Sequence, residues 1–237
     1  MVKSQMINQK LIQGTPAWLA MRKEHVTATD AGVIMGFNQW QTIGQLLDYK
    51  LGLRPEQEDN DYMKYGRETE PEARRALEEH LGISLYPKVV ISPLGARMAS
   101  LDGISMDGKT VVEIKCPGAK DHAVALKGQV PEKYMPQLQH ILAITDAKEI
   151  FYWSYRDGSG TLVAIPRDDD YIARLVEKEI AFYAIMVAGQ KKIKEHEDFL
   201  DELKNKAYGL LDGTGITNEL LRVDRRATDE GESLSPQ

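Results

Sequence analysis

Two acidic residues and a lysine in the middle of the chain form a pattern that suits hydrolysis of phosphate esters. Asp102 lies in a short Ser-Leu-Asp-Gly run, and Glu113 and Lys115 follow on an apolar stretch. Side chains at i and i+2 of a strand point to the same face, so Glu113 and Lys115 are expected to meet Asp102 on one side. Carboxylate oxygens suit Mg²⁺ or Mn²⁺, and a lysine beside the metal can hold or deprotonate an attacking water. The pattern predicts metal-dependent cleavage of a phosphodiester.

Strands must position these three residues. Short β-rich runs separated by Pro-Leu-Gly and Met-Asp-Gly-Lys turns predict an antiparallel meander, with strands at 85–91, 96–101 and 110–114. Asp102 is then expected in the turn directly after the second of these strands. Glu113 and Lys115 are expected at the end of the third.

Helical patterns surround the predicted meander. Four helices are expected before the meander. The first begins at Pro16, and the others span residues 29–36, 42–51 and 61–81. Pro71 either begins a new helix or kinks the last of these. Later segments predict helices at 119–127 and 131–144, a strand pair at 149–155 and 161–165, an amphipathic helix at 171–189, and a more polar helical segment at 191–211.

This order of elements predicts a mixed α/β fold, in which a central mixed sheet is flanked by helices. The 237 residues, 42% of them hydrophobic, are enough for one sizeable core. We expect a single domain over residues 1–211 that includes a helical C-terminal extension. Residues 212–237 are expected to form a tail that is disordered from about residue 227, because nothing there can be buried.

The composition narrows the class of partner. The net charge of −6 argues against nucleic acid, but the segments 56–61 and 228–237 hold seven acids and no base, and removing those seven charges from −6 leaves +1. A local basic surface is therefore required for DNA binding. No apolar stretch approaches the roughly 20 residues of a membrane span, and no apolar signal region follows the N-terminus, so we expect a cytoplasmic protein with no membrane partner. The single cysteine, Cys116, excludes an internal disulfide and a cysteine-bound metal cluster.

Several short motifs follow one another along the chain. They are GTPAW at 14–18 with Arg22, VTATD at 26–30, GRETE at 66–70, SLDG at 100–103, EIKCP at 113–117 and YMPQLQ at 134–139. In this order they resemble the family of phage lambda exonuclease and the YqaJ-type viral recombinases, within the PD-(D/E)xK nuclease superfamily. The resemblance covers roughly residues 14–190, and Leu101 stands where the superfamily shorthand has proline.

The resemblance implies a PD-(D/E)xK nuclease-like core and a Mg²⁺-dependent 5′-to-3′ exonuclease, with Mn²⁺ as a substitute metal. Such an enzyme starts at double-stranded DNA ends, releases 5′-mononucleotides and leaves 3′ overhangs. It implies three further expectations: a homotrimer, a single-strand annealing protein as partner in phage recombination, and a bacterial host cell as location.

The resemblance also assigns roles within the catalytic set. Asp102 and Glu113 are expected to hold the metal, and Glu70 to reach it directly or through water. Lys115 is expected to orient the attacking water, with a purely structural ion pair to Glu113 as the alternative. The remaining members, Gln137 and Tyr134, lie three apart on one helix face. Gln137 is expected to contact the metal-bound water or the phosphate.

A second group matches the pocket that binds the DNA 5′-phosphate in the family. Arg22, Thr29 and Ser100 match its positions, and Lys120 lies near a basic one. A guanidinium with hydroxyl donors is a sound receptor for a terminal phosphate. The alternative for Thr29 is a helix cap. Of the tryptophans outside these sets, Trp40 is the best candidate for touching DNA, whereas the other two are expected in the core.

Two other functions remain as alternatives to an exonuclease. One is a restriction-type or structure-specific endonuclease on the same fold, although an enzyme that cuts internally needs no receptor for a terminus. The other is a catalytically silent DNA-end clamp, which the presence of every expected acid and of Lys115 argues against.

Overall fold

The computed structural model describes residues 11, 13–55 and 60–211, with side chains up to residue 206. The chain divides into two compact units, residues 1–188 and 189–237. The expected tail at 212–237 and most of the acidic segment that begins at residue 56 lie outside the described residues. None of the helices in the described ranges has the length and apolarity to cross a membrane.

The first unit is built on one six-stranded mixed sheet. Its strands are β1 (Val26–Thr27), β2 (Leu85–Ile91), β3 (Arg97–Ser105), β4 (Val111–Lys115), β5 (Glu149–Arg156) and β6 (Ser159–Pro166). The order is β1-β3-β4-β5-β6, with β2 also paired to β3. The β2–β3–β4 and β5–β6 pairs are antiparallel, as predicted, whereas β1–β3 and β4–β5 are parallel.

The helices of this unit agree closely with the predicted ones. They are α1 (Pro16–Glu24), α2 (Ala28–Ile34), α3 (Ile43–Lys50), α4 (Asp61–Leu81), α5 (Ala119–Ala125), the 3₁₀ turn η1 (Glu132–Tyr134), α6 (Met135–Thr145) and the first part of α7 (Asp169–Leu211). The helix α4 runs continuously through Pro71, so the alternative in which Pro71 begins a new helix is wrong.

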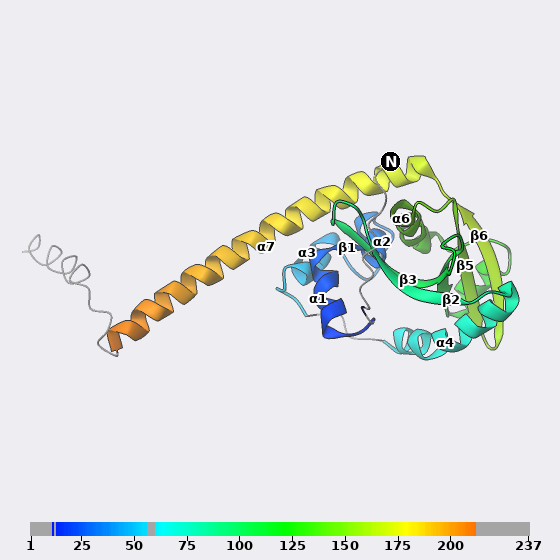
Figure 1. Ribbon diagram of the computed structural model, residues 1–237, viewed down its shortest axis with the longest axis horizontal. Helices are drawn as coiled ribbons and strands as arrows, with labels where there is room; N and C mark the ends of the chain where they lie inside the picture. The colour runs from blue at the N-terminus through cyan, green and yellow to red at the C-terminus, as the bar shows by residue number, and fades with distance from the viewer. Residues whose placement is uncertain (1–10, 12, 56–59, 212–237) are drawn as a thin grey trace, which may run out of the picture. The chain divides into compact units, whose positions relative to one another are not determined.

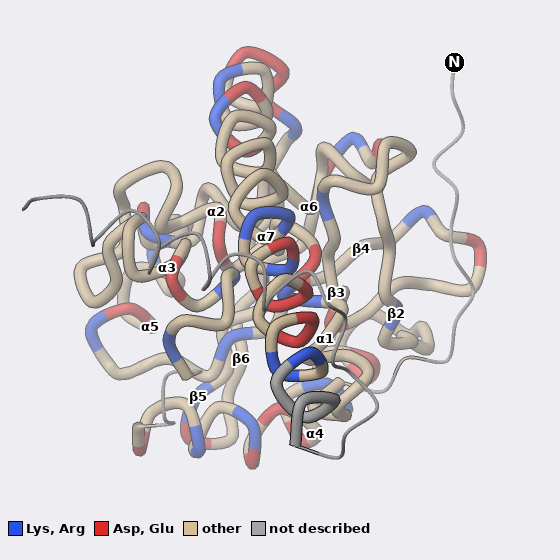
Figure 2. Tube along the Cα trace, turned by 90° about the vertical axis from the view of Figure 1, so that its left-hand side faces the viewer, with Lys and Arg blue, Asp and Glu red and all other residues tan. Residues whose placement is uncertain are grey.

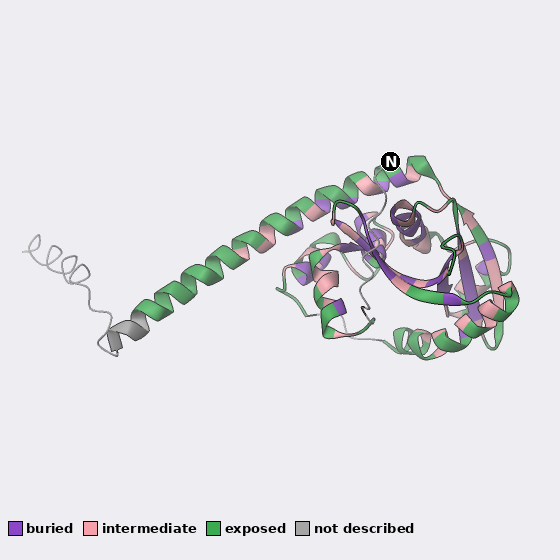
Figure 3. Cartoon of the chain, viewed as in Figure 1, coloured by how far each residue is buried: buried purple, intermediate pink, exposed green. Residues whose placement is uncertain are grey.

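The sheet is covered on both faces, by α6 on one side and α4 on the other (Figure 1). Buried residues concentrate in α6 and β5 (Figure 3). Along β4, Val111 joins the cluster on the α6 side, whereas Val112 and Ile114 join the cluster with α4. Glu113 and Lys115 have the same parity as Val111 and therefore face α6, which confirms that they share one side.

The helix α7 begins on the core of the first unit. Ile172 packs into the α6 cluster, and Glu179 is fully buried against His140 of α6, whose Nδ1 lies 2.6 Å from Glu179 Oε1. The other ring nitrogen of His140 meets the carbonyl oxygen of Met98 on β3 at 3.1 Å. The predicted amphipathic helix at 171–189 is thus confirmed, and its polar contacts connect α6, α7 and β3.

The described part of the second unit is the helical segment 189–211. Its side chains are mostly exposed, and basic and acidic residues alternate along α7 (Figure 2). Ion pairs one helical turn apart join them, among them Lys191 with Glu195 and Lys206 with Glu202. This agrees with the prediction of a polar helical segment at 191–211.

The close contact of Gly160, near the start of β6, with the neighbouring strand leads to a prediction about stability. A Cβ added at Gly160 would lie 1.9 Å from Cζ2 of Trp153 on β5, which is buried. Because the indole is packed and cannot retreat, Gly160→Ala is expected to lower the free energy of unfolding by about 1–3 kcal/mol or more. Urea denaturation measures this loss. The exposed neighbour Ser159→Ala is the control, and equal stability of the two variants would contradict the packing argument.

Candidate active site

Asp102 lies inside strand β3, so the prediction of a turn at this position is wrong. Strand β3 continues because it pairs with β2 on one edge and with β4 on the other through Gly103 and Val112. A Cβ at Gly103 would lie 2.7 Å from Cγ2 of Val112 and 3.0 Å from Cβ of Leu85. Gly103 is therefore required for close strand packing and not for a turn. The half-buried Asp102 accepts a hydrogen bond from the backbone N–H of Ile114 at 2.8 Å, which ties it to β4.

Glu113 is the centre of the polar contacts on β4. Its Oε1 accepts hydrogen bonds from Nζ of Lys115, at 2.5 Å, and from Nε2 of Gln137 on α6. Its Oε2 is buried and finds no hydrogen-bond partner within the described part of the chain. Tyr134 lies beside this group, with the Lys115 ammonium 5.7 Å from the centroid of its ring. The structure thus brings together five of the predicted catalytic residues, counting Asp102 on the neighbouring strand.

The charges in this group are unbalanced. Burial, and next to it the charge of Glu113, raises the pKa of Asp102 well above its ordinary value. Burial also raises the pKa of Glu113, although Lys115 opposes the shift. For Lys115 burial acts to lower the pKa, but the two carboxylates outweigh it and the pKa is raised. Lys115 therefore stays cationic, and one ammonium serves the carboxyl groups of Asp102 and Glu113, which repel each other.

This donor set fits a divalent cation. A buried carboxylate oxygen without a partner is costly, and a cation beside Oε2 of Glu113 and the carboxylate of Asp102 would remove that cost. Both groups offer the hard oxygen ligands that Mg²⁺ prefers. Glu70 on α4 raises the pKa of both acids, but its Oε1 is paired with Arg74 at 2.6 Å. Accordingly, no group of three acidic, histidine or cysteine side chains with metal-site spacing occurs in the described ranges.

Three of the four residues predicted for the phosphate pocket are linked through Trp18. Arg22 Nη2 donates to the hydroxyl of Thr29 at 3.4 Å, and the guanidinium carbon lies 4.7 Å from the centroid of the Trp18 ring. The Trp18 indole N–H donates to the hydroxyl of Ser100 at 2.9 Å. Lys120, in contrast, is exposed on α5 and makes none of these contacts. Arg22, Thr29 and Ser100 thus form a connected polar group around one indole.

The alternative role of Thr29 as a helix cap is wrong. The N-cap of α2 is Thr27, whose backbone N–H donates to Oδ2 of Asp30 at 2.7 Å in a capping box. Thr29 is the second residue of the helix, in its first turn, and its hydroxyl lies 3.0 Å from the Thr27 hydroxyl. It is therefore available to a ligand beside Arg22 without loss of the cap.

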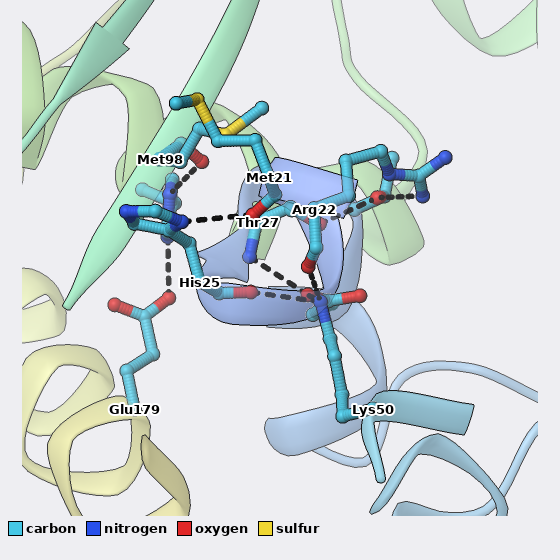
Figure 4. Close-up of polar contacts among 10 residues, drawn as sticks. Met21, Arg22, His25, Thr27, Lys50, Met98 and Glu179 are labelled. Carbon is cyan, nitrogen blue, oxygen red and sulfur yellow. Dashed lines mark hydrogen bonds and ion pairs between the residues drawn. The ribbon is translucent and has the colours of Figure 1, made fainter. Parts of the chain in front are cut away.

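Lys50 is a buried lysine that the sequence analysis missed, and it supports the backbone on which Arg22 lies. Lys50, at the end of α3, donates from Nζ to the backbone oxygens of Arg22 at 2.6 Å and His25 at 2.8 Å, and pairs with Asp30 at 2.6 Å. Figure 4 shows its ammonium between these oxygens, which belong to the end of α1. Lys50 therefore joins the last turn of α1 to the first turn of α2. A lysine on the apolar side of a helix beside Leu46 and Tyr49 was the available signal.

Removal of the Lys50 ammonium is expected to destabilise the fold strongly. Lys50→Met leaves the buried carboxylate of Asp30 without its cation, which costs about 3–5 kcal/mol of unfolding free energy. Urea denaturation measures the loss, and the double variant with Asp30→Asn should recover part of it. Lys109→Met, at an exposed ion pair, is the control and is expected to change little. A Lys50 variant as stable as this control would contradict the proposed support.

The family model of the YqaJ-like viral recombinase domain matches residues 17–148. The chain belongs to this family. The family membership confirms the resemblance, and the matched segment contains every predicted site residue, from Arg22 to Gln137. A curated YqaJ-family relative, the uncharacterized protein YqaJ of Bacillus subtilis strain 168, is 26% identical over 199 residues, or 81% of this chain. The chain spans 62% of the length of that relative.

Solved structures agree with the YqaJ-like assignment. The alkaline exonuclease from Laribacter hongkongensis is 28% identical, with a TM-score of 0.67 over 78% of this chain and 100% of that chain. The same exonuclease in complex with dAMP is 26% identical, with a TM-score of 0.68 over the same shares of the two chains. A phage-related exonuclease from Haemophilus somnus shares the fold, with 14% identity and a TM-score of 0.54 over 73% of this chain and 96% of that chain. The fold is therefore the predicted PD-(D/E)xK nuclease-like core.

Proposed function

We propose that this YqaJ-like chain is a Mg²⁺-dependent exonuclease that digests double-stranded DNA from 5′ ends, releases 5′-mononucleotides and leaves 3′ overhangs. The observation that carries the proposal is the meeting of Asp102, Glu113 and Lys115 on neighbouring strands, beside Gln137. The similarity to an alkaline exonuclease, one structure of which holds dAMP, supports the same reaction class.

The residues of the group have separate tasks in this proposal. Asp102 and Glu113 would hold Mg²⁺, which when bound polarises a phosphate oxygen and acidifies a water. Lys115 stays cationic, so it positions the nucleophile and offsets the negative charge that grows on the phosphate. Gln137 fixes the orientation of Glu113 through its amide N–H. Glu70 is a further ligand in the proposal and would have to exchange Arg74 for the metal.

The polar group of Arg22, Thr29 and Ser100 would give the enzyme its preference for DNA ends. A terminal phosphate dianion needs cationic and hydroxyl donors, and Arg22 and Thr29 provide both at 3.4 Å from each other. Binding of the 5′-phosphate there would fix the polarity of digestion. In the same proposal the enzyme acts as a homotrimer in the cytoplasm of a bacterial host, next to a single-strand annealing protein. Mass measurement in solution and co-purification test these two associations.

One assay separates this proposal from its alternatives. Linear duplexes with 5′-phosphate or 5′-hydroxyl ends and closed circles are incubated with Mg²⁺, with Mn²⁺ or with EDTA. Metal-dependent loss of phosphorylated linear duplex, with circles intact, is the expected result. Cutting of circles would favour the endonuclease, and binding of ends without digestion would favour the silent clamp.

Arg22→Ala is expected to slow digestion of 5′-phosphorylated duplex by about 10- to 100-fold and to abolish the preference over 5′-hydroxyl ends, since a charge-assisted bond to phosphate contributes about 1.5–3 kcal/mol. Rates on the two substrates measure the preference. Arg75→Ala removes an equal charge from an exposed position of α4 and is the control. An Arg22 variant that keeps the preference would remove this residue from the phosphate pocket.

A further inference from the structure

A row of alternating cations and aromatic rings leads from the candidate active site to the surface. The Lys115 ammonium lies 5.7 Å from the centroid of the Tyr134 ring, and Lys133 Nζ lies 5.0 Å from the same ring. Lys133 Nζ also lies 5.6 Å from the centroid of the Trp40 ring. We call Lys115, Tyr134, Lys133 and Trp40 the Trp40 row. It connects β4, η1 and the loop before α3.

The outer half of the Trp40 row is held in place. Oδ2 of Asp121 on α5 pairs with Lys133 Nζ at 2.5 Å and fixes the ammonium between the two rings. Oδ1 of Asn38 accepts hydrogen bonds from the backbone N–H groups of Trp40, at 2.8 Å, and Gln41, at 2.9 Å. These two bonds fix the backbone of the loop. An ammonium has three donors, so Lys133 keeps capacity for a further acceptor after the bond to Asp121.

Trp40 is exposed in a way that the other tryptophans are not. Its side chain is 69% exposed, compared with 8% for Trp18 and 2% for Trp153. Burial of an indole is strongly favourable, so a held but exposed indole is a costly feature unless a ligand covers it. The Lys133 ammonium lies near the Trp40 ring, and the exposed part of the indole is accessible to a planar ligand that stacks on it.

We propose that Trp40 stacks on a nucleobase of the DNA strand near the bond that is cut, and that Lys133 binds a phosphate of the same strand. A nucleic-acid strand presents flat bases and anionic phosphates in alternation, which matches rings and ammonium groups in alternation. The proposal rests on the proposed function.

The position of the row limits which nucleotide is bound. Its three steps measure between 5.0 and 5.7 Å, so Trp40 lies within about 16 Å of Lys115. This distance corresponds to about five nucleotides at 3.4 Å each, so the stacked base belongs to the segment adjoining the cleaved phosphate. Stacking on an indole tolerates every base, which suits an enzyme that advances along any sequence.

Tryptophan fluorescence tests the proposal without any hydrolysis. Because Trp18 and Trp153 are buried, Trp40 is the residue that a stacked base can quench. The full chain is titrated in EDTA with duplexes that carry a short single-stranded end, and binding is followed in parallel by fluorescence anisotropy of labelled DNA. Quenching that saturates with binding is the expected result, and it should disappear in Trp40→Phe.

Affinity measurements on Trp40 variants complete the test. Trp40→Ala is expected to weaken DNA binding by about 5- to 150-fold, and Trp40→Phe, which keeps a ring, should recover much of the loss. Leu94→Ala, at another exposed apolar side chain, is the control. Wild-type binding without quenching, or equal affinities of the Ala and Phe variants, would overturn stacking while leaving the nuclease proposal intact. Absence of any DNA binding or digestion by the wild-type chain would instead overturn the proposed function.

Discussion

Asp102→Asn is expected to reduce digestion of linear duplex DNA by at least about 1,000-fold while the fold and DNA binding are retained. The amide keeps an oxygen that can accept the N–H of Ile114, so the link between β3 and β4 survives. What is lost is the negative charge that would hold Mg²⁺. A bound metal supplies several kcal/mol of transition-state stabilisation, and each 1.4 kcal/mol or so is a factor of ten in rate. Release of acid-soluble nucleotides from 5′-phosphorylated duplex measures the effect.

A second measurement separates loss of metal from loss of structure. Mg²⁺ is expected to raise the Tm of the wild-type chain, because a ligand that binds only the folded state stabilises it, and to have little effect on Asp102→Asn. Asp107→Asn removes a carboxylate from the exposed turn between β3 and β4 and is the matched control. If the Asp102→Asn variant keeps both its turnover and the Mg²⁺-dependent rise in Tm, the assignment of Asp102 to the metal site is wrong.

Local patterns were sufficient to predict the part of the site that lies on one strand. The alternation along β4 places Glu113 and Lys115 on the same face, and a two-residue period needs no knowledge of the remaining chain. The environment of Asp102 could not be obtained in this way. Its place inside β3 depends on pairing with β2 and β4 and on the close packing at Gly103, which are contacts between distant segments.

The residues predicted for the phosphate pocket show the same difference between local and long-range information. The family motifs named Arg22, Thr29 and Ser100 individually, but the indole of Trp18 that links them joins α1 to a strand 82 positions away. Lys50 was missed for a related reason. A charged residue is normally exposed, and only the carbonyl groups at the end of α1 and the carboxylate of Asp30 explain why this one is buried.

Lys115→Met is expected to lower the rate of digestion by about 100- to 1,000-fold even when the metal site is saturated. Removal of one preorganised donor that stabilises charge in a transition state typically costs this much. The structure also offers a purely structural explanation for Lys115, since its ammonium pairs with Glu113. The two explanations differ in what Mg²⁺ can restore, because a bound dication could replace the ammonium as partner of Glu113 but could not supply the hydrogen bond that the ammonium gives to the nucleophile.

The decisive comparison therefore follows Tm and turnover of Lys115→Met as Mg²⁺ is increased. If Lys115 positions the nucleophile, the Tm approaches that of the wild-type chain at high Mg²⁺ while the rate stays low. Recovery of both together would assign Lys115 to structure alone. Lys127→Met, an equal loss of charge at an exposed position just beyond α5, should leave both properties unchanged. A rate defect that persists when stability has returned would assign the chemical step to Lys115, because the fold and the metal would then be equivalent in the two proteins.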